Sequence, residues 1–217
     1  MTILIDTSTH SAYGIKYYKN GKYYKTFAKK EIILSAGSVG TPQLLMLSGI
    51  GPKNHLNQLK IPLIKDLPVG FNLHDHSGYG VTFLTDKPVT FRGDRYANSI
   101  ANMTYEFNQT GPLSSPLPEA LGFIYSKFSK IMERHPDLQV TLLPTTLTSD
   151  RDSARLIQHY SDELYNTRYL PIEGKEAFTI ILALIHAKSV GTISLQSKNP
   201  FDQPVIDTNY FGEEDDI

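Results

Sequence analysis

Residues 31–51 read EIILSAGSVGTPQLLMLSGIG, and this stretch decides the fold class. Its first part, Glu31–Leu34, is a short apolar run of the kind found in buried strands. Ser35–Gly40 then consists almost entirely of small residues. Thr41-Pro42 suits the start of a helix, because a threonine hydroxyl accepts from a free amide and proline needs no amide there. The stretch therefore predicts a strand, a tight turn and a helix that runs through Gln43–Ser48 and is ended by Gly49 as its C′ residue.

The turn in this stretch is the first candidate binding site. The small side chains of Ala36, Gly37 and Ser38 would let a ligand approach the main chain closely. The amides at the start of the helix after Pro42 would add a weakly positive site that can face a phosphate or a polar cofactor edge. Tight packing of the strand on the helix is the alternative explanation of the same small residues.

The sequence upstream of this stretch predicts a β-hairpin. Two tyrosine-rich runs, Ala12–Tyr18 and Lys22–Ala28, flank the triplet Lys19-Asn20-Gly21. Asn-Gly is a strong hairpin signal, because both residues tolerate positive φ. An earlier run, Ile3-Leu4-Ile5, also reads as a strand.

Downstream, the sequence predicts a mixture of short helices and strands. We expect helices at Pro52–Leu59 and Ala97–Phe107, the second of them ended by Gly111-Pro112, and helical spacing over Asp150–Tyr165. Ile61–Leu84 is punctuated by proline and glycine and reads as loop with short strands. Further strands are expected at three places: Val140–Leu143, Phe178–Ile185 and Gly191–Gln196.

Composition excludes several classes of function. The 217 residues include 21 lysines and arginines against 22 acids, so a formal charge of −1 gives no electrostatic case for nucleic acid or an anionic membrane as partner. The absence of cysteine excludes disulfides, thiolate metal sites and cysteine catalysis in this segment. The most apolar window, Phe178–Ala187, is far shorter than the roughly 20 residues that cross a bilayer.

Both ends of the chain lead us to expect a fragment. The first residues read as a strand at once, without the basic start and long apolar run of a signal peptide. The last residues, Glu213–Ile217, carry four acids that suit the first turn of a helix, where carboxylates offset the positive end of the dipole. A frayed acidic tail is the alternative explanation.

The sequence contains no dinucleotide or hydrolase motif, and we predict no metal site. G-x-G-x-x-G, P-loop, H-E-x-x-H and G-x-S-x-G patterns are all absent. His74-Asp75-His76 suggests metal ligands, but residues i and i+2 of an extended chain point to opposite faces. We expect a hydrogen-bonded structural or cofactor-adjacent loop there. The isolated histidines are expected at the surface or as satisfied core residues: His10, His55, His135, His159 and His186.

Residues 37–51 resemble, position for position, a signature of the glucose–methanol–choline (GMC) flavoprotein oxidoreductases. Gly111–Ser115 suggests the arthropod glucose dehydrogenase-like branch. Asn102-Met103-Thr104 and Asn108-Gln109-Thr110 are N-glycosylation sequons and, with that branch, favour an extracellular location. Further stretches fit the family: Glu31–Gly37, Leu67–His76, Ser189–Leu195 and Asn199–Asp207.

The resemblance implies a fold and a set of domains. It implies a mixed α+β and α/β fold, in which a Rossmann-type FAD-binding domain is joined to a substrate domain built on an antiparallel sheet, with both ends truncated. Residues 1–80 would belong to the FAD-binding domain and residues 81–185 to the substrate-binding domain. Residues 186–217 would begin the C-terminal half of the family fold.

The resemblance also implies the chemistry. Members bind FAD and oxidise an alcohol, a sugar or a choline-like substrate by passing hydride to the flavin, with oxygen or a quinone as acceptor. Ser35, Ala36 and Gly37 would then contact the cofactor. The family's catalytic histidine would lie beyond Ile217, so no catalytic residue is assigned, and we expect this segment alone to be inactive.

One departure keeps other functions open. Where the family commonly has P-x-S-R-G, this chain has Ala187–Gly191 with Val190 in place of the arginine, which removes a bidentate donor. A non-catalytic binding or structural module on the same scaffold is therefore an alternative. A third possibility is an FAD-containing lyase with the same fold.

Overall fold

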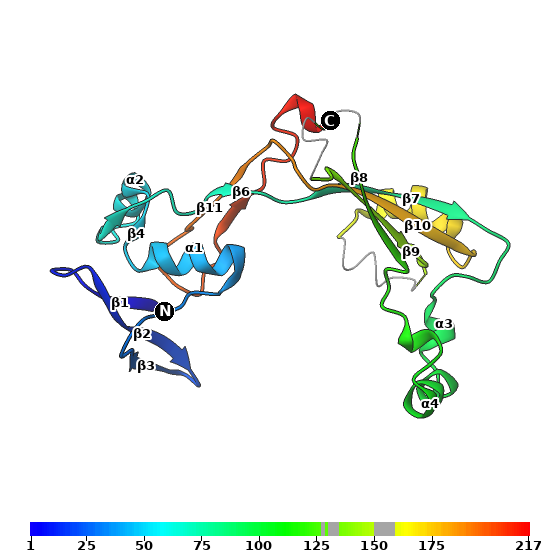
Figure 1. The fold of residues 1–217 in the computed structure, drawn as a ribbon, viewed down its shortest axis with the longest axis horizontal. Helices are drawn as coiled ribbons and strands as arrows, with labels where there is room; N and C mark the ends of the chain where they lie inside the picture. Colours follow the sequence, from blue (N-terminus) through cyan, green and yellow to red (C-terminus); the bar gives the residue numbers. More distant parts are fainter. Residues whose placement is uncertain (127–128, 130–134, 150–158) are drawn as a thin grey trace. The chain divides into compact units, whose positions relative to one another are not determined.

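The computed structural model describes residues 1–126, 129, 135–149 and 159–217, which form two compact units. Unit 1 comprises Met1–Asp75 and Ala187–Ile217, and unit 2 comprises His76–His186 (Figure 1). The chain thus leaves unit 1 once and returns to it. The fold is α+β: helices are mixed with antiparallel sheets, as the sequence predicted.

The predicted hairpin is present in unit 1. β1 (Thr2–Asp6), β2 (Ser11–Lys19) and β3 (Lys22–Phe27) form an antiparallel sheet in the order β1-β2-β3. Asn20 and Gly21 join β2 to β3 with φ angles of 50° and 80°. Two positive φ angles are what a two-residue hairpin turn requires, so the Asn-Gly signal is confirmed.

Helix α1 (Gly37–Leu47) lies between this sheet and a second one in unit 1 (Figure 1). The second sheet has the order β12-β11-β6, from β6 (Phe71–Leu73), β11 (Gly191–Ser194) and β12 (Val205–Asp207). Ser48 joins α1 to the first sheet, since its hydroxyl accepts from the Ile3 amide at 2.8 Å and donates to the Leu44 carbonyl at 2.6 Å.

The core of unit 1 forms where α1 meets α2 (Lys53–Gln58) and β11. Met46, Leu56, Ile61 and Leu195 are buried together there. A short parallel pair, β4 (Ile50–Gly51) with β5 (Lys65–Asp66), connects α1 to the segment after α2. These contacts fix the end of α1, while its first residues remain exposed.

The sequence placed the start of α1 wrongly. The helix begins at Gly37 rather than at Thr41-Pro42, and Pro42 lies inside it. Proline lacks an amide hydrogen, so Pro42 leaves only the Ser38 carbonyl, four residues earlier, without its helical donor. Ser38 is exposed, so water can donate to that carbonyl instead. The end was predicted correctly. Gly49, two residues after the last helical residue, has a φ of 86°, and its amide donates to the Met46 carbonyl, as in a glycine C-cap.

The expected buried strand Glu31–Leu34 was also wrong. These residues are outside any sheet, and Ile33 is 77% exposed. A strand requires a paired neighbour, and the part of the chain that the structure describes supplies none beside this run. An apolar run alone therefore did not determine pairing.

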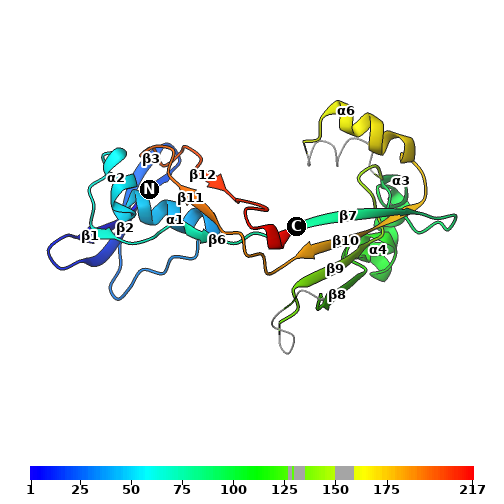
Figure 2. The ribbon, with the colours of Figure 1, turned by 90° about the horizontal axis from the view of Figure 1, so that it is seen from above.

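Unit 2 is built on a four-stranded antiparallel sheet in the order β7-β10-β9-β8 (Figure 2). Its strands are β7 (Ser77–Leu84), β8 (Ala120–Ile124), β9 (Leu138–Leu143) and β10 (Ala177–Leu184). The strands expected at Val140–Leu143 and Phe178–Ile185 are confirmed, whereas β7 is longer than the short strands expected before Leu84. A glycine in β7 permits close approach of β10, since a Cβ at Gly78 would lie only 2.9 Å from the Leu182 carbonyl oxygen.

Short helices complete unit 2. α3 (Gly93–Tyr96), α4 (Ser99–Asn108) and η1 (Pro112–Ser114) follow β7, and α4 confirms the helix expected near Ala97–Phe107. Asn98 caps α4 by accepting from the Ala101 amide at 2.9 Å. Much of the helix expected over Asp150–Tyr165 lies outside the described residues. Within the described end of that range lies α6 (Asp162–Leu164), which is followed by η2 (Tyr165–Tyr169) and η3 (Leu170–Ile172). In unit 1, η4 (Glu214–Asp216) is the last element.

Candidate functional site

The turn Ser35–Gly37 lies at the exposed start of α1. All three residues are exposed, and the Ala36 amide donates to the Thr41 hydroxyl at 3.1 Å. Gly37 has φ of 80°, and a Cβ built on it would meet no atom within 4 Å. The main chain of the turn is therefore accessible, and no bulky side chain of the described residues fills the space above Gly37.

The position of this turn has an electrostatic consequence. The first amides of an α-helix have no partner within the helix, and the helix dipole leaves them weakly positive. α1 is eleven residues long, and no acidic side chain lies in its first turn. An exposed helix start next to small side chains can receive a phosphate or another anionic edge of a nucleotide.

The loop that follows Gly70 is the second candidate, and its backbone geometry depends on that glycine. Gly70 has φ of 87°, and a Cβ there would lie 2.0 Å from the Ile193 carbonyl oxygen. The Gly70 carbonyl in turn accepts from the Ile193 amide at 2.7 Å. This glycine therefore allows β6 and β11 to approach. The stretch Asn72–His76 begins within β6 and continues past its end.

The polar side chains of this loop are hydrogen-bonded. His74 Nε2 lies 3.1 Å from Asn72 Oδ1, and the Tyr210 hydroxyl donates to Asp75 Oδ2. The bond to Asp75 raises the pKa of Tyr210, and partial burial adds to the rise. The described residues contain no cluster of three metal-ligating side chains. The expected hydrogen-bonded loop is thus present, with Tyr210 as a partner from 135 residues further along the chain.

The segment that departs from the family motif is tied to the C-terminal residues. The Lys188 and Ser189 amides donate to the Asp216 carboxylate at 2.8 and 2.7 Å, and the Ser189 hydroxyl also donates to it. Partial burial acts to raise the pKa of Asp216, but these bonds lower it on balance. The Val190 side chain is 42% exposed, and its carbonyl accepts from Asn209 Nδ2 at 3.1 Å.

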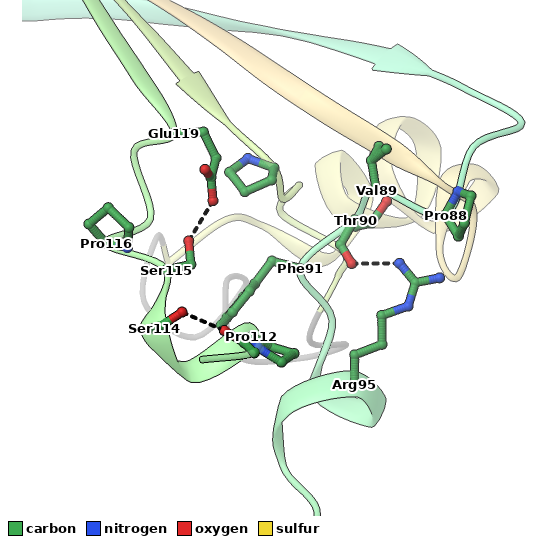
Figure 3. Close-up of a pocket in the computed structure, with 12 residues that line it drawn as sticks. Pro88, Val89, Thr90, Phe91, Arg95, Pro112, Ser114, Ser115, Pro116 and Glu119 are labelled. Carbon is green, nitrogen blue, oxygen red and sulfur yellow. Dashed lines mark hydrogen bonds between the residues drawn. The ribbon is translucent and has the colours of Figure 1, made fainter. Parts of the chain in front are cut away.

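Unit 2 contains a concave region of about 450 Å³ between the segment after β7 and the segment after α4 (Figure 3). Phe91 lines its floor and stacks on Tyr96, with ring centroids 4.4 Å apart. Glu119 lies in the wall and accepts from the Ser115 hydroxyl at 2.6 Å. The remaining lining is mixed, with polar side chains such as Arg95 and Ser114 beside four proline rings: Pro88, Pro112, Pro116 and Pro144.

A carboxylate and two arginines hold one side of this pocket. Glu176 Oε1 lies 2.5 Å from Arg95 Nη2 and 3.2 Å from Arg92 Nη1. Thr90 is 2% exposed, its amide donates to Glu176 Oε2 at 3.1 Å, and its hydroxyl exchanges two bonds with the main chain of Ala177. The bonds from Arg95, opposed by partial burial and helped by the Thr90 amide, lower the pKa of Glu176 to about 2.

Sequence reasoning proposed the turn and the loop as candidate sites but did not point to the pocket or to the partners of the loop. Glu119, Glu176 and Tyr210 stand in no recognisable motif. Glu176 and Tyr210 each bond to a residue that only folding brings near, whereas the partner of Glu119, Ser115, lies four positions earlier in the chain. Of the isolated histidines, His55 is a satisfied structural residue, as expected: its Nε2 accepts from the Leu195 amide at 3.0 Å. None of the helices in the described residues is long and apolar enough to span a bilayer.

Residues 1–78 match a family model described as GMC oxidoreductase. The chain is 36% identical over 217 residues to ecdysone oxidase from Bombyx mori, with 99% of this chain and 31% of the relative covered. It is 34% identical to mitochondrial choline dehydrogenase from Homo sapiens, with 95% of this chain and 32% of the relative covered. The chain thus spans about a third of the length of these relatives.

Solved structures show the same fold. A formate oxidase from Aspergillus oryzae, solved to study FAD modification in an R554K variant, superposes with a TM-score of 0.81 and 25% identity. The superposition covers 99% of this chain and 39% of that protein. The likeness extends across both units, and these findings confirm the resemblance that the sequence predicted.

Proposed function

We propose that this chain, which belongs to the GMC oxidoreductase family, is part of an FAD-dependent enzyme that oxidises a CH–OH group to a carbonyl. The observation that carries the proposal is the family match over residues 1–78, a stretch that includes the open turn Ser35–Gly37. When bound, FAD supplies the hydride acceptor for this reaction.

Unit 1 is the proposed cofactor side, with Ser35, Ala36 and Gly37 against the nucleotide part of FAD. The features of the turn fit such a group: its main chain is accessible, and it leads directly into the exposed first turn of α1, whose amides have no partner within the helix. The loop Asn72–His76 is the proposed second contact, held in place by the bond from Tyr210 to Asp75.

Unit 2 is the proposed substrate side. In its pocket, the proline rings and Phe91 would receive the apolar part of an alcohol, and the Glu119 carboxylate would accept a hydroxyl hydrogen or face a cationic group. The relatives' names suggest alcohols resembling ecdysone or choline as substrates. We propose oxygen or a quinone as the electron acceptor; the first would make the enzyme an oxidase and the second a dehydrogenase.

Flavin content and flavin reduction test the function in the full-length protein. We expect a yellow protein whose flavin absorbance is bleached by an alcohol or sugar under anaerobic conditions. A protein that lacks flavin and cannot be reconstituted with FAD would favour the non-catalytic module suggested by Val190. Bound flavin that no alcohol or sugar reduces would instead favour a lyase.

A substitution in the turn tests the assigned cofactor contact. Ala36→Leu adds an apolar side chain beside the accessible main chain, so we expect at least tenfold weaker FAD binding, which corresponds to about 1.4 kcal/mol. Ala12→Leu is the matched control, because it makes the same change at an exposed position of β2. FAD dissociation is measured by recovery of flavin fluorescence. Equal affinity of both variants and wild type would remove Ser35–Gly37 from the cofactor site.

A further inference from the structure

Positive charge is concentrated in one hairpin of unit 1, the basic hairpin formed by β2 and β3. Residues 7–30 contain six lysines and no acid, although the whole chain has 21 basic and 22 acidic residues. Four of these lysines lie within the hairpin strands, and all four are exposed: Lys16, Lys19, Lys22 and Lys25. The near-zero net charge of the chain therefore conceals a local cationic surface.

The register of the hairpin brings these lysines together in like-charged pairs. Lys16 lies opposite Lys25, and Lys19 lies opposite Lys22. Like charges directly across a strand pair destabilise a sheet. No ion pair compensates any of the four lysines within the described residues, although the Lys16 ammonium lies 4.6 Å from the centre of the Tyr23 ring. An anionic partner would remove this repulsion.

Protection of a sheet edge explains only part of the pattern. β3 is the edge strand of its sheet, and lysines on an edge discourage association with other chains. Lys19 lies beyond the last residue of β2 that β1 pairs, so the same explanation applies to it. Lys16 instead pairs with Thr2 of β1 on one side and with Lys25 of β3 on the other, where no edge needs protection. A second cause is therefore required for the pair that Lys16 forms with Lys25.

Tyrosine rings lie between the lysine pairs. Tyr17 stacks on Tyr24 across the strands with centroids 5.6 Å apart, and Tyr18 meets Tyr23 edge-on at 5.1 Å. Tyr23 and Tyr24 are about half exposed. Tyrosine, which has an apolar ring and a polar hydroxyl, is enriched at the level of lipid headgroups.

We propose that the basic hairpin docks on the surface of an anionic phospholipid membrane. Side chains alternate along a strand, so each face of the hairpin carries only one lysine pair, and a rod-shaped polyanion lying on one face would meet only two lysines. A headgroup layer that meets the hairpin at its turn reaches the lysines of both faces and the adjacent tyrosines. The turn itself, Asn20-Gly21, has no apolar side chain to insert, so binding is peripheral and sensitive to salt.

Vesicle sedimentation of the full-length protein tests this proposal. We expect binding to vesicles of phosphatidylcholine with about 30 mol% phosphatidylserine, no binding to phosphatidylcholine alone, and release at about 0.5 M salt. Lys19→Gln/Lys22→Gln should weaken binding about thirtyfold, since each lysine near such a surface contributes a factor of about five. The matched control is Lys60→Gln/Lys65→Gln, which makes the same charge change at exposed positions of unit 1 and should bind like wild type.

Four outcomes would overturn the proposal. They are no binding at low salt, equal binding to neutral and anionic vesicles, equal weakening by the control pair, and binding to heparin or DNA without binding to vesicles. The proposal does not rest on the enzymatic function, because vesicle binding is measured without substrate. Flavin content and turnover in solution should be unchanged in Lys19→Gln/Lys22→Gln, and circular dichroism shows whether the variant is folded.

Discussion

The carboxylate of Glu176 should stabilise unit 2 in a pH-dependent way. Its pKa is lowered from 4.5 to about 2, chiefly by the bonds from Arg95, and its side chain is only 19% exposed. A shift of this size corresponds to about 3 kcal/mol of stability at pH 7. Because the folded-state pKa lies below the unfolded value, this contribution is present above pH 4.5 and is lost as the pH falls toward 2.

Glu176→Gln removes the charge and keeps the shape of the side chain. Its amide nitrogen would also face one of the donors of Arg95, so the arginine loses its ionic partner and one of its two acceptor oxygens. We expect opening of the surrounding structure to become easier by about 3 kcal/mol at pH 7, or roughly a hundredfold loss of protection against hydrogen exchange. The difference between wild type and variant should shrink steadily between pH 4.5 and 2.

Hydrogen exchange measured by mass spectrometry reports this locally in the full-length protein. The informative peptides contain Thr90 and Ala177, whose amides donate to Glu176 and to the Thr90 hydroxyl. Rates are corrected for the intrinsic exchange rate at each pH. Glu106→Gln, an exposed position of α4, is the control and should change nothing. A difference at pH 7 below about 0.5 kcal/mol, or one that persists unchanged at pH 2, would refute the role assigned to Glu176.

Two further substitutions test the packing of unit 1. Gly70→Ala should destabilise unit 1 by more than about 3 kcal/mol, because a Cβ would lie 2.0 Å from the Ile193 carbonyl oxygen at a φ of 87°. The urea midpoint of the full-length protein measures this, and an unchanged midpoint would contradict the close approach of β6 to β11. Leu56→Ala should cost about 2–5 kcal/mol, since the side chain is fully buried against Met46 and Ile61. A shift in melting temperature no larger than that of an exposed substitution such as Asn57→Ala would contradict this core.

Much of the local structure could be predicted from the sequence. The Asn20-Gly21 turn, the end of α1 at Gly49 and helix α4 depend on the conformational preferences of a few neighbouring residues, and all three were predicted correctly. The prediction for Glu31–Leu34 was wrong because strand formation depends on a partner that an apolar run does not specify. The start of α1 was wrong because a proline past the first turn removes one bond whose carbonyl water can reach.

The amino-acid sequence by itself determined the hairpin turn, the short helices and the GMC resemblance, because each depends on residues that are adjacent along the chain. Only the tertiary structure decided which distant residues meet. Folding places Glu176 beside Thr90, separated by 86 positions, and Tyr210 beside Asp75. The lysine pairs of the basic hairpin follow instead from the register that the two-residue Asn20-Gly21 turn sets locally. The contacts of Glu176 with Thr90 and of Tyr210 with Asp75 depend on chain reversals between distant segments, which no single stretch of sequence records.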